Sequence, residues 1–426
     1  MTSTEKPFTI SIPDSEIEFL RKKLELTRFP DELEEAGRDY GAPLADVRRL
    51  VERWKSGYDW RAHEAQLNAE FPQFTRDIEV EGHGTLNIHY VHKKSEVVDA
   101  IPLVFVHGWP GSIIEVRKIL PLLLEASPDH PSFHVVAFSL PGYGFSEAPK
   151  KKGFADAQMA EVGHKLMLAL GYHEYVAQGG DWGATICRTM AQLYGPKHVK
   201  AWHTNMPFAY PPHPTRRPLL LLQHLLFKYT PQDQARLERT QWYLEHGNGY
   251  LKQQSTQPQT LGYSLADSPA GLLAWIYEKL YQWTDDYKWT DDEVYWFSRA
   301  GPAASLRLYY EYMKVHPIGD WSKTVLETDV PTGHSYFPKE ESLISSRTAW
   351  PTPPLLFEYV SWHSSGFPNV IFESDHDKGG HFAAHEVPEA LVGDLRKMFG
   401  KGGPAFGAVP GKTGNQDTTH DFSSYT

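Results

Sequence analysis

The sequence contains little of what several classes of protein require. It has a single cysteine, Cys187, so no disulfide can form within the chain, and this suits a reducing compartment. No run approaches the roughly 20 apolar residues of a membrane span. The longest candidate, residues 219–227, is interrupted by Gln223 and His224. The short, polar N-terminus also has no apolar segment of the kind a secretion signal needs. We therefore expect a soluble, cytoplasmic protein without a membrane span.

Positive charge is in deficit as well. The chain carries 42 Lys and Arg against 53 Asp and Glu, a net charge of -11, and its basic residues form no stripe. Nucleic acids and anionic membranes bind basic surfaces, so neither is an expected partner. No group of Cys and His has the spacing of a zinc site. We expect neither a metal nor an organic cofactor.

Apolar residues, by contrast, are sufficient for a large core, at 41% hydrophobic and 13% aromatic. From Ile101 onward, short apolar strands alternate with helical patterns. The expected strands are 101–106, 135–140, 175–178, 199–204, 332–337 and 369–372, and the expected helices are 156–170, 184–193 and one starting near Glu386. This alternation predicts a mostly parallel sheet with both faces covered. Ahead of it we expect two helices, the first capped at residues 13–15, and a β-hairpin turning at 82–84.

The most informative motif is Gly-Gly-Asp-Trp-Gly at residues 179–183. It lies between an expected strand and an expected helix, which is the setting of a nucleophile elbow. The exposed residue of that turn is Asp181, where an esterase would carry serine. A carboxylate attacks a saturated carbon and leaves an ester, whereas a serine hydroxyl suits a carbonyl. The motif therefore favours epoxides as substrates first and alkyl halides second.

Two later residues complete an expected triad, because α/β hydrolases carry nucleophile, acid and histidine in that order along the chain. His381, in a Gly-Gly-His-Phe loop, is the candidate base, with His376 and His385 as alternatives in the same loop. Glu340 follows the preceding strand and would orient the imidazole, with Glu341 as its alternative.

The loop His-Gly-Trp-Pro-Gly at residues 107–111 directly follows an expected strand. This fold places its second oxyanion-hole donor there. We expect the backbone N–H groups of Trp109 and Trp182 to stabilise the oxyanion, and we interpret His107 as structural. A partial repeat of the elbow motif at residues 319–321 has no strand before it and receives little weight.

These features predict an α/β-hydrolase fold with a mostly parallel sheet, a helical lid and an N-terminal extension of helices and a hairpin. We divide the chain into the extension (1–95), the first part of the core (96–206), a helical lid rich in aromatic residues (207–330), the second part of the core (331–400) and a flexible tail (401–426). Cys187 follows the elbow on an expected buried helix, and we interpret it as a core residue.

The motifs resemble those of the microsomal-type epoxide hydrolases, in particular their soluble fungal branch. The resemblance extends from about residue 7 to 400 and includes Arg-Phe-Pro at 28–30, Tyr-Asp-Trp-Arg at 58–61 and Phe-Pro-Gln-Phe at 71–74. It implies two lid tyrosines, Tyr250 and Tyr309, with Tyr310 as the alternative to the second, and it places the family's acid on Glu340. One departure is an extra segment at residues 342–358, either a surface loop or an error in the gene model.

Together these residues predict a two-step hydrolysis of an epoxide to a vicinal diol. Asp181 forms an ester while the tyrosines protonate the oxygen, and His381 then activates water. The expected partners are a small epoxide and water, and the fungal relatives are consistent with a homodimer. A haloalkane dehalogenase would share the aspartate without needing the phenols. A catalytically silent fold that binds a ligand is the alternative from another class.

Overall fold

The computed structural model describes residues 4–207, 231–289, 297–316, 328–340 and 369–416, together with residues 218 and 222. Within these residues the centre is a nine-stranded sheet in the order β1-β2-β3-β5-β4-β6-β7-β8-β9. Its strands are β1 (Lys6–Pro7), β2 (Gln73–Val80), β3 (Gly84–Lys93), β4 (Ile101–Val106), β5 (Phe133–Phe138), β6 (Tyr175–Gly179), β7 (Val199–Thr204), β8 (Thr332–Tyr336) and β9 (Val370–Asp375).

The sheet is antiparallel at one edge and parallel elsewhere. Strands β1, β2 and β3 pair antiparallel, and β3 joins β5 in the same way. From β5 through β4, β6, β7 and β8 to β9 every pairing is parallel. The expected hairpin and the mostly parallel sheet are both confirmed. Parallel strands all end at the same edge, which is where the loops after β4, β6, β8 and β9 come together.

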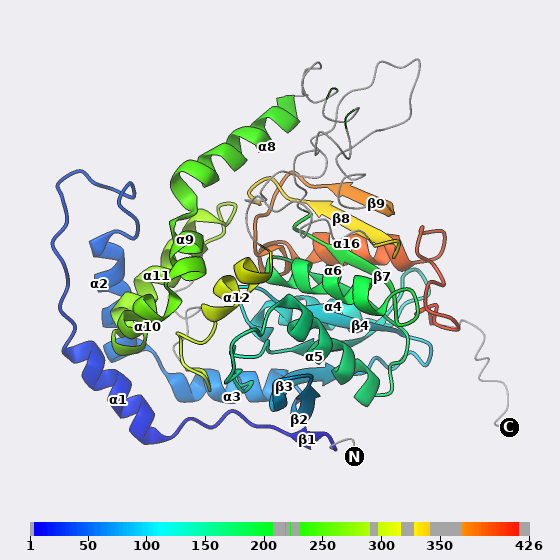
Figure 1. The fold of residues 1–426 in the computed structure, drawn as a ribbon, viewed down its shortest axis with the longest axis horizontal. Coiled ribbons are helices and arrows are strands. Elements are labelled where there is room, and N and C mark those ends of the chain that lie inside the picture. The colour runs from blue at the N-terminus through cyan, green and yellow to red at the C-terminus, as the bar shows by residue number, and fades with distance from the viewer. Residues whose placement is uncertain are drawn as a thin grey trace, which may run out of the picture.

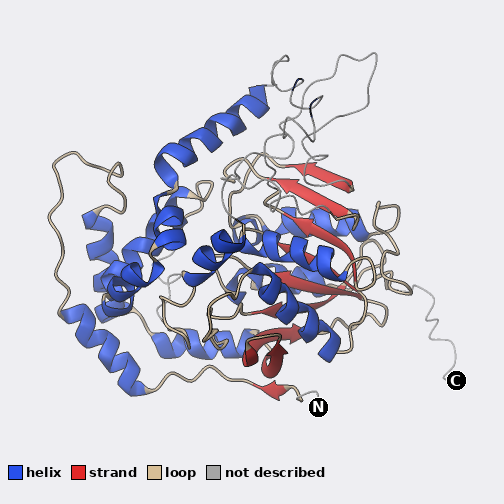
Figure 2. Ribbon diagram, in the orientation of Figure 1, coloured by secondary structure: helices blue, strands red, loops and turns tan. Residues whose placement is uncertain are grey.

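Helices cover both faces of this sheet (Figures 1 and 2). The described helices are α1 (Asp14–Glu25), α2 (Leu44–Glu52), α3 (Trp60–Glu70), α4 (Ile119–Leu124), α5 (Asp156–Ala169), α6 (Trp182–Tyr194), α8 (Pro231–Trp242), α9 (Gly249–Thr256), α10 (Pro258–Asp267), α11 (Pro269–Gln282), α12 (Arg307–Val315), α15 (Ala383–Glu386) and α16 (Pro388–Phe399). Strand β4 shows the two-sided core directly. Its Val104 and Val106 pack with residues of α5 and α6, whereas Leu103 and Phe105 pack with residues of α4 and α16. Alternate side chains of a strand point to opposite faces, so a strand buried on both sides reads as a continuous apolar run.

The N-terminal region differs from expectation in two details. Helix α1 starts after Pro13 without a side-chain cap, so the cap expected at residues 13–15 is wrong. A third helix, α3, was not expected. The Asp59 side chain caps it by accepting a hydrogen bond from the backbone N–H of Ala62 at 3.1 Å. An aspartate three residues before a free N–H is the ordinary signal for a helix start.

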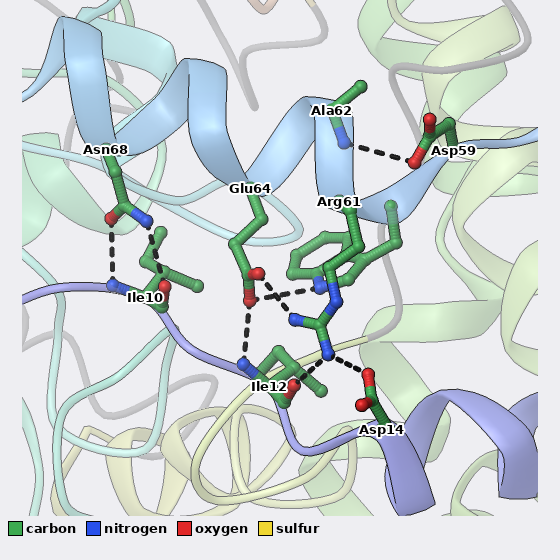
Figure 3. Close-up of polar contacts among 9 residues, drawn as sticks. Ile10, Ile12, Asp14, Asp59, Arg61, Ala62, Glu64 and Asn68 are labelled. Atoms are coloured by element: carbon green, nitrogen blue, oxygen red, sulfur yellow. Dashed lines mark hydrogen bonds and ion pairs between the residues drawn. The ribbon is translucent and has the colours of Figure 1, made fainter.

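The chain between β1 and α1 runs along α3 and is fixed to it by side-chain hydrogen bonds (Figure 3). Asn68 accepts from the backbone N–H of Ile10 and donates to the carbonyl of Ile10, both at 2.8 Å. Glu64 accepts from the backbone N–H of Ile12 at 2.7 Å, and Arg61 donates to the carbonyl of Ile12 at 2.7 Å. These bonds replace the backbone partners that an isolated extended segment lacks. We call residues 8–13 the N-terminal strap.

The described part of the chain between β7 and β8 is helical and comprises α8 to α12; we call it the helical segment. Helix α9 contacts α12, and α11 contacts α1 and α2 of the N-terminal region. Figure 1 shows these helices gathered beside the sheet rather than within it. Among the described helices, none has the length and apolar character that crossing a bilayer demands.

The C-terminal residues 401–416 are packed against the core, although we expected a flexible tail from residue 401. Ala405 and Val409 are buried. Gly414 accepts from the backbone N–H of Ser132 at 2.8 Å and donates to the carbonyl of Asp99 at 3.0 Å. The glycine-rich composition that suggested flexibility instead supports tight turns, four of them with glycine at positive φ. Residues 417–426 lie outside the described residues.

Candidate active site

Asp181 lies at the tip of the turn between β6 and α6, with φ 51° and ψ -129°. A non-glycine residue in this region of backbone space costs about 1–3 kcal/mol and is found mainly at functional sites. The neighbouring glycines allow the turn to lie against β4. A Cβ atom on Gly183 would stand 1.9 Å from the carbonyl oxygen of Val106, and one on Gly180 would stand 2.6 Å from the Asn205 amide nitrogen. The expected elbow geometry is present, and the close approach explains the glycines on both sides of Asp181.

Two backbone donors converge on the Asp181 carboxylate. The N–H of Trp109, in the loop after β4, donates to its Oδ1 at 2.7 Å, and the N–H of Trp182 at the start of α6 donates as well. A Cβ atom on Gly108 would lie 2.3 Å from that Oδ1, so the loop can approach this closely only with glycine there. Both residues predicted for the oxyanion hole therefore lie beside the predicted nucleophile.

His381 and Glu340 come from the loops after β9 and β8 and meet at the same place. The His381 Nδ1 lies 2.9 Å from Oε1 of Glu340, and its Nε2 lies 3.6 Å from Oδ2 of Asp181. The alternatives do not reach this position. His376 pairs with Asp394 at 2.5 Å, and His385 lies 3.1 Å from the Tyr287 hydroxyl.

The charges around His381 hold it in its protonated form. Burial lowers its pKa, but the carboxylates of Glu340 and Asp181 outweigh burial and raise the pKa to about 10. Burial also raises the pKa of Asp181 above its usual value, while His381 and the two backbone donors oppose that rise. The resting site is thus an imidazolium between two carboxylates. Any reaction that neutralises Asp181 removes one of the charges that keep the proton on His381.

The two predicted tyrosines lie next to each other on the helical segment, and both interact electrostatically with the Asp181 carboxylate. Tyr250 on α9 and Tyr309 on α12 have ring centroids 5.9 Å apart, and each contacts the indole of Trp109. Burial raises the pKa of both phenols well above 10, and Asp181 adds to the effect. Both hydroxyls therefore remain protonated at neutral pH. The alternative Tyr310 instead lies under the ammonium of Lys314.

Two residues near these phenols and carboxylates were not predicted. The Tyr243 hydroxyl lies 3.0 Å from that of Tyr250. The Glu115 carboxylate interacts with the backbone N–H of Gly108, next to the N–H that binds Asp181. Burial, assisted by Asp181, raises the pKa of Glu115 to about 8. No motif singles out either residue, since each reaches the site only through three-dimensional packing.

A cavity of about 370 Å³ adjoins the site and shares the side chain of Trp109 with it. Its walls come from five parts of the chain: the N-terminal region, the loop after β4, residues 142–145 after β5, the helical segment, and residues 382 and 385 after β9. Among the lining side chains are Ile10, Trp60, Glu115, Trp275, Trp289 and Phe382. Mostly apolar walls with few polar groups are typical of a site for a small organic ligand.

Two residues interpreted as structural behave in that way. His107 donates from Nδ1 to the carbonyl of Gly108 at 2.9 Å and accepts from the N–H of Leu140 at 3.1 Å, and burial lowers its pKa to about 4. Cys187 is fully buried in α6, and burial raises its pKa.

The described residues contain no group of three or more His, Cys, Asp or Glu arranged to hold a metal ion. Residues 319–321, Glu341 and the extra segment at 342–358 lie outside the described residues.

The chain is similar to known proteins over most of its length. Residues 5–116 match the family model described as epoxide hydrolase N terminus, and residues 101–287 match the alpha/beta hydrolase fold. Epoxide hydrolase 1 of Sus scrofa is 35% identical over 93% of this chain and 88% of its own length.

Two solved structures are also similar over nearly the whole chain. The epoxide hydrolase of Aspergillus niger is 32% identical, with a TM-score of 0.73 over 92% of this chain and 95% of that one. The juvenile hormone epoxide hydrolase of the silkworm Bombyx mori is 31% identical, with a TM-score of 0.78 over 92% and 93%. The predicted fold class and the predicted resemblance are both confirmed, and this chain belongs to the epoxide hydrolase family.

Proposed function

We propose that this chain converts epoxides to vicinal diols through a covalent ester on Asp181. The proposal rests mainly on one observation: the Asp181 carboxylate lies near both a candidate base, His381, and candidate acids, two phenols. His381 lies 3.6 Å from the Asp181 carboxylate, and the buried phenols of Tyr250 and Tyr309 are near enough for that carboxylate to raise their pKa values. Relatives at 31–36% identity that are named epoxide hydrolases support hydrolysis of epoxides as the activity.

In the first step the Asp181 carboxylate oxygen forms a bond to one ring carbon, and the bond from that carbon to the epoxide oxygen breaks. The electron pair goes to the oxygen, which takes a proton from a tyrosine. An alkoxide is a poor leaving group without such a proton donor. The hydroxyls of Tyr250 and Tyr309 both suit this role, because both are buried and their raised pKa values keep them protonated.

In the second step His381 takes a proton from water, which attacks the ester carbonyl of Asp181. Ester formation has by then removed the negative charge of Asp181, one of the groups that raise the pKa of His381. The imidazolium therefore releases its proton more readily, which balances the proton that the phenolate must regain, and the neutral ring becomes a base when the ester needs one. Collapse of the tetrahedral intermediate breaks the bond from the carbonyl carbon to the diol oxygen, and that oxygen takes the proton that His381 removed from water. The N–H groups of Trp109 and Trp182 stabilise the oxyanion, an interaction typically worth about 3 kcal/mol per donor.

A haloalkane dehalogenase would use the same aspartate, so the phenols decide between the two. A halide leaves as an anion and needs no proton, whereas an epoxide oxygen does. Two buried phenols with raised pKa values, both interacting electrostatically with Asp181, favour epoxide opening. Diol formation from styrene oxide without halide release from a chloroalkane would separate the activities.

The test is a single turnover in isotopically labelled water with enzyme in excess over styrene oxide. The diol's new oxygen should come from the Asp181 carboxylate, so the first turnover should yield unlabelled diol and labelled enzyme. Asp181→Asn should abolish diol formation, and His381→Gln should leave substrate mass on the peptide bearing Asp181. Label in the first diol would exclude the ester route.

A further inference from the structure

A buried cation lies against the face of the Tyr250 ring. Lys279, on α11, is 3% exposed, and its Nζ is 4.7 Å from the ring centroid of Tyr250. The same Nζ lies 5.7 Å from the ring of Trp275 and 5.9 Å from that of Trp283. Its neighbour Glu278 pairs with it at 2.6 Å. The ammonium is thus surrounded by three aromatic rings, one of them a proposed proton donor.

Burying an ammonium is unfavourable, because the charge loses its hydration. An apolar side chain of similar volume would fill the same space without this cost. Contacts between a cation and aromatic faces offset part of this cost. They do not explain why the charge lies beside Tyr250 in particular. The reaction supplies a reason, because it moves negative charge toward the phenols.

The same helix also holds the base. The carbonyl of Trp283, which follows α11, accepts a hydrogen bond from the backbone N–H of His381 at 2.9 Å, and the two rings are 4.8 Å apart. Helix α11 and the residue that follows it therefore contact both the proposed acid Tyr250 and the proposed base His381. A change at Lys279 that disturbed this helix would affect both steps, whereas a change in charge alone would affect only the step that charges the phenol.

We propose that Lys279 is a positioning residue that holds Tyr250 in place and stabilises the negative charge developing on it during epoxide opening. This inference rests on the proposed function. In that step one negative charge leaves Asp181, the C–O bond breaks, and the electron pair ends on the epoxide oxygen and the phenol that donates to it. A fixed positive charge on the receiving side stabilises the transition state more than the ground state. Ester hydrolysis places its charge at the backbone N–H groups instead, so Lys279 contributes little to that step.

The experiment measures both steps separately for Lys279→Met, an uncharged variant of similar length, and for Lys279→Arg, which keeps the charge. Single turnovers of styrene oxide in the His381→Gln background give the rate of ester formation, and the decay of the ester with His381 intact gives the rate of hydrolysis. Lys279→Met should slow ester formation about tenfold or more, with hydrolysis changed less than about threefold. Lys279→Arg should retain most of the ester-forming rate.

A double-mutant cycle with Tyr250→Phe distinguishes this role from structural support. Lys279 acting through the phenol predicts that Lys279→Met adds little once that hydroxyl is gone. Equal slowing of both steps, or losses that multiply with Tyr250→Phe, would overturn the inference. If Lys279→Met does not fold, Glu278→Gln tests the proposal instead, because it removes the anion paired with Lys279 and leaves the ammonium in place. Ester formation should then be as fast as in the wild type or faster. A slower rate would contradict the proposal. Failure of the proposed function is recognised separately, since Asp181→Asn would then still form diol.

Discussion

The indole of Trp109 stacks on the phenol ring of Tyr250, with centroids 5.2 Å apart and planes 7° from parallel. The backbone N–H of the same tryptophan donates to the Asp181 carboxylate at 2.7 Å. One residue of the loop after β4 therefore sets the position of the nucleophile through its backbone and of a phenol through its side chain. Because the phenol belongs to the helical segment, this contact aligns two parts of the chain that are far apart in sequence.

Trp109→Ala should separate the two functions of this residue. The backbone N–H remains, so hydrolysis of the ester should be little changed. Loss of the indole leaves Tyr250 without its stacking partner and removes a contact of Tyr309. Ester formation should slow about tenfold or more, because small misplacements of reacting groups lower the rate strongly. Rapid-quench measurement of the two steps tests this, with the half-exposed Trp242→Ala as control. Equal slowing of both steps would contradict it.

Glu340→Gln should act on the second step. Of the groups that raise the pKa of His381, the Glu340 carboxylate has the largest effect. With this carboxylate in place the pKa of His381 is about 10. Without that charge the pKa of His381 should fall and its ring should lose its fixed orientation. Ester hydrolysis should slow by roughly a hundredfold or more, by analogy with other triads. Mass spectrometry should then find the Asp181 ester accumulating in steady state, and the exposed Glu389→Gln should behave as wild type.

The two steps should also differ in their dependence on pH. Ester formation needs an ionised Asp181 and protonated phenols. The pKa of Asp181 lies above its usual 3.8, so the rate should fall as pH drops through that raised value. The phenol pKa values lie well above 10, so no loss should occur at moderately alkaline pH. Hydrolysis needs neutral His381 and should rise with pH instead. A decline of ester formation between pH 8 and 9 would contradict the assignment of the phenols.

The sequence allowed the strands and the turn at Asp181 to be predicted because each is a local pattern. Strand β4 is apolar at every position, and the glycines at 180 and 183 are the small residues that an elbow turn requires. Helix α3 was missed because Trp60 and Glu64 are its only buried residues, so it has no apolar stripe. Tyr250 and Tyr309 were named only through the family resemblance. Lys279 reaches the site by packing between distant segments, and Glu115, although it follows the loop after β4, belongs to no motif that marks it.

The N-terminal strap should affect the cavity without affecting the chemistry. Asn68 makes two hydrogen bonds to the backbone of Ile10, whose buried side chain lines the cavity. Asn68→Ala should lower the free energy of unfolding by about 1–2 kcal/mol, the usual effect of leaving such groups unpaired. KM for a bulky epoxide should rise while kcat stays within about twofold, since Asp181 and His381 are untouched. Urea unfolding and steady-state kinetics test both expectations, and a fall in kcat with unchanged KM would contradict them.

A matched pair of glycine variants should separate stability from activity at the elbow. A Cβ atom on Gly183 would meet the backbone carbonyl of Val106 at 1.9 Å, where neither side can yield, so Gly183→Ala should lower the free energy of unfolding by about 3 kcal/mol or more. A Cβ atom on Gly108 would meet the Asp181 side chain at 2.3 Å, and that side chain can rotate away. Gly108→Ala should therefore fold with little loss of stability yet form the ester at least about a hundredfold more slowly, because the carboxylate leaves its donors. Thermal unfolding combined with single-turnover kinetics would show the two variants failing in different ways. A Gly108→Ala protein with normal ester formation would mean that the carboxylate need not lie where the structure has it.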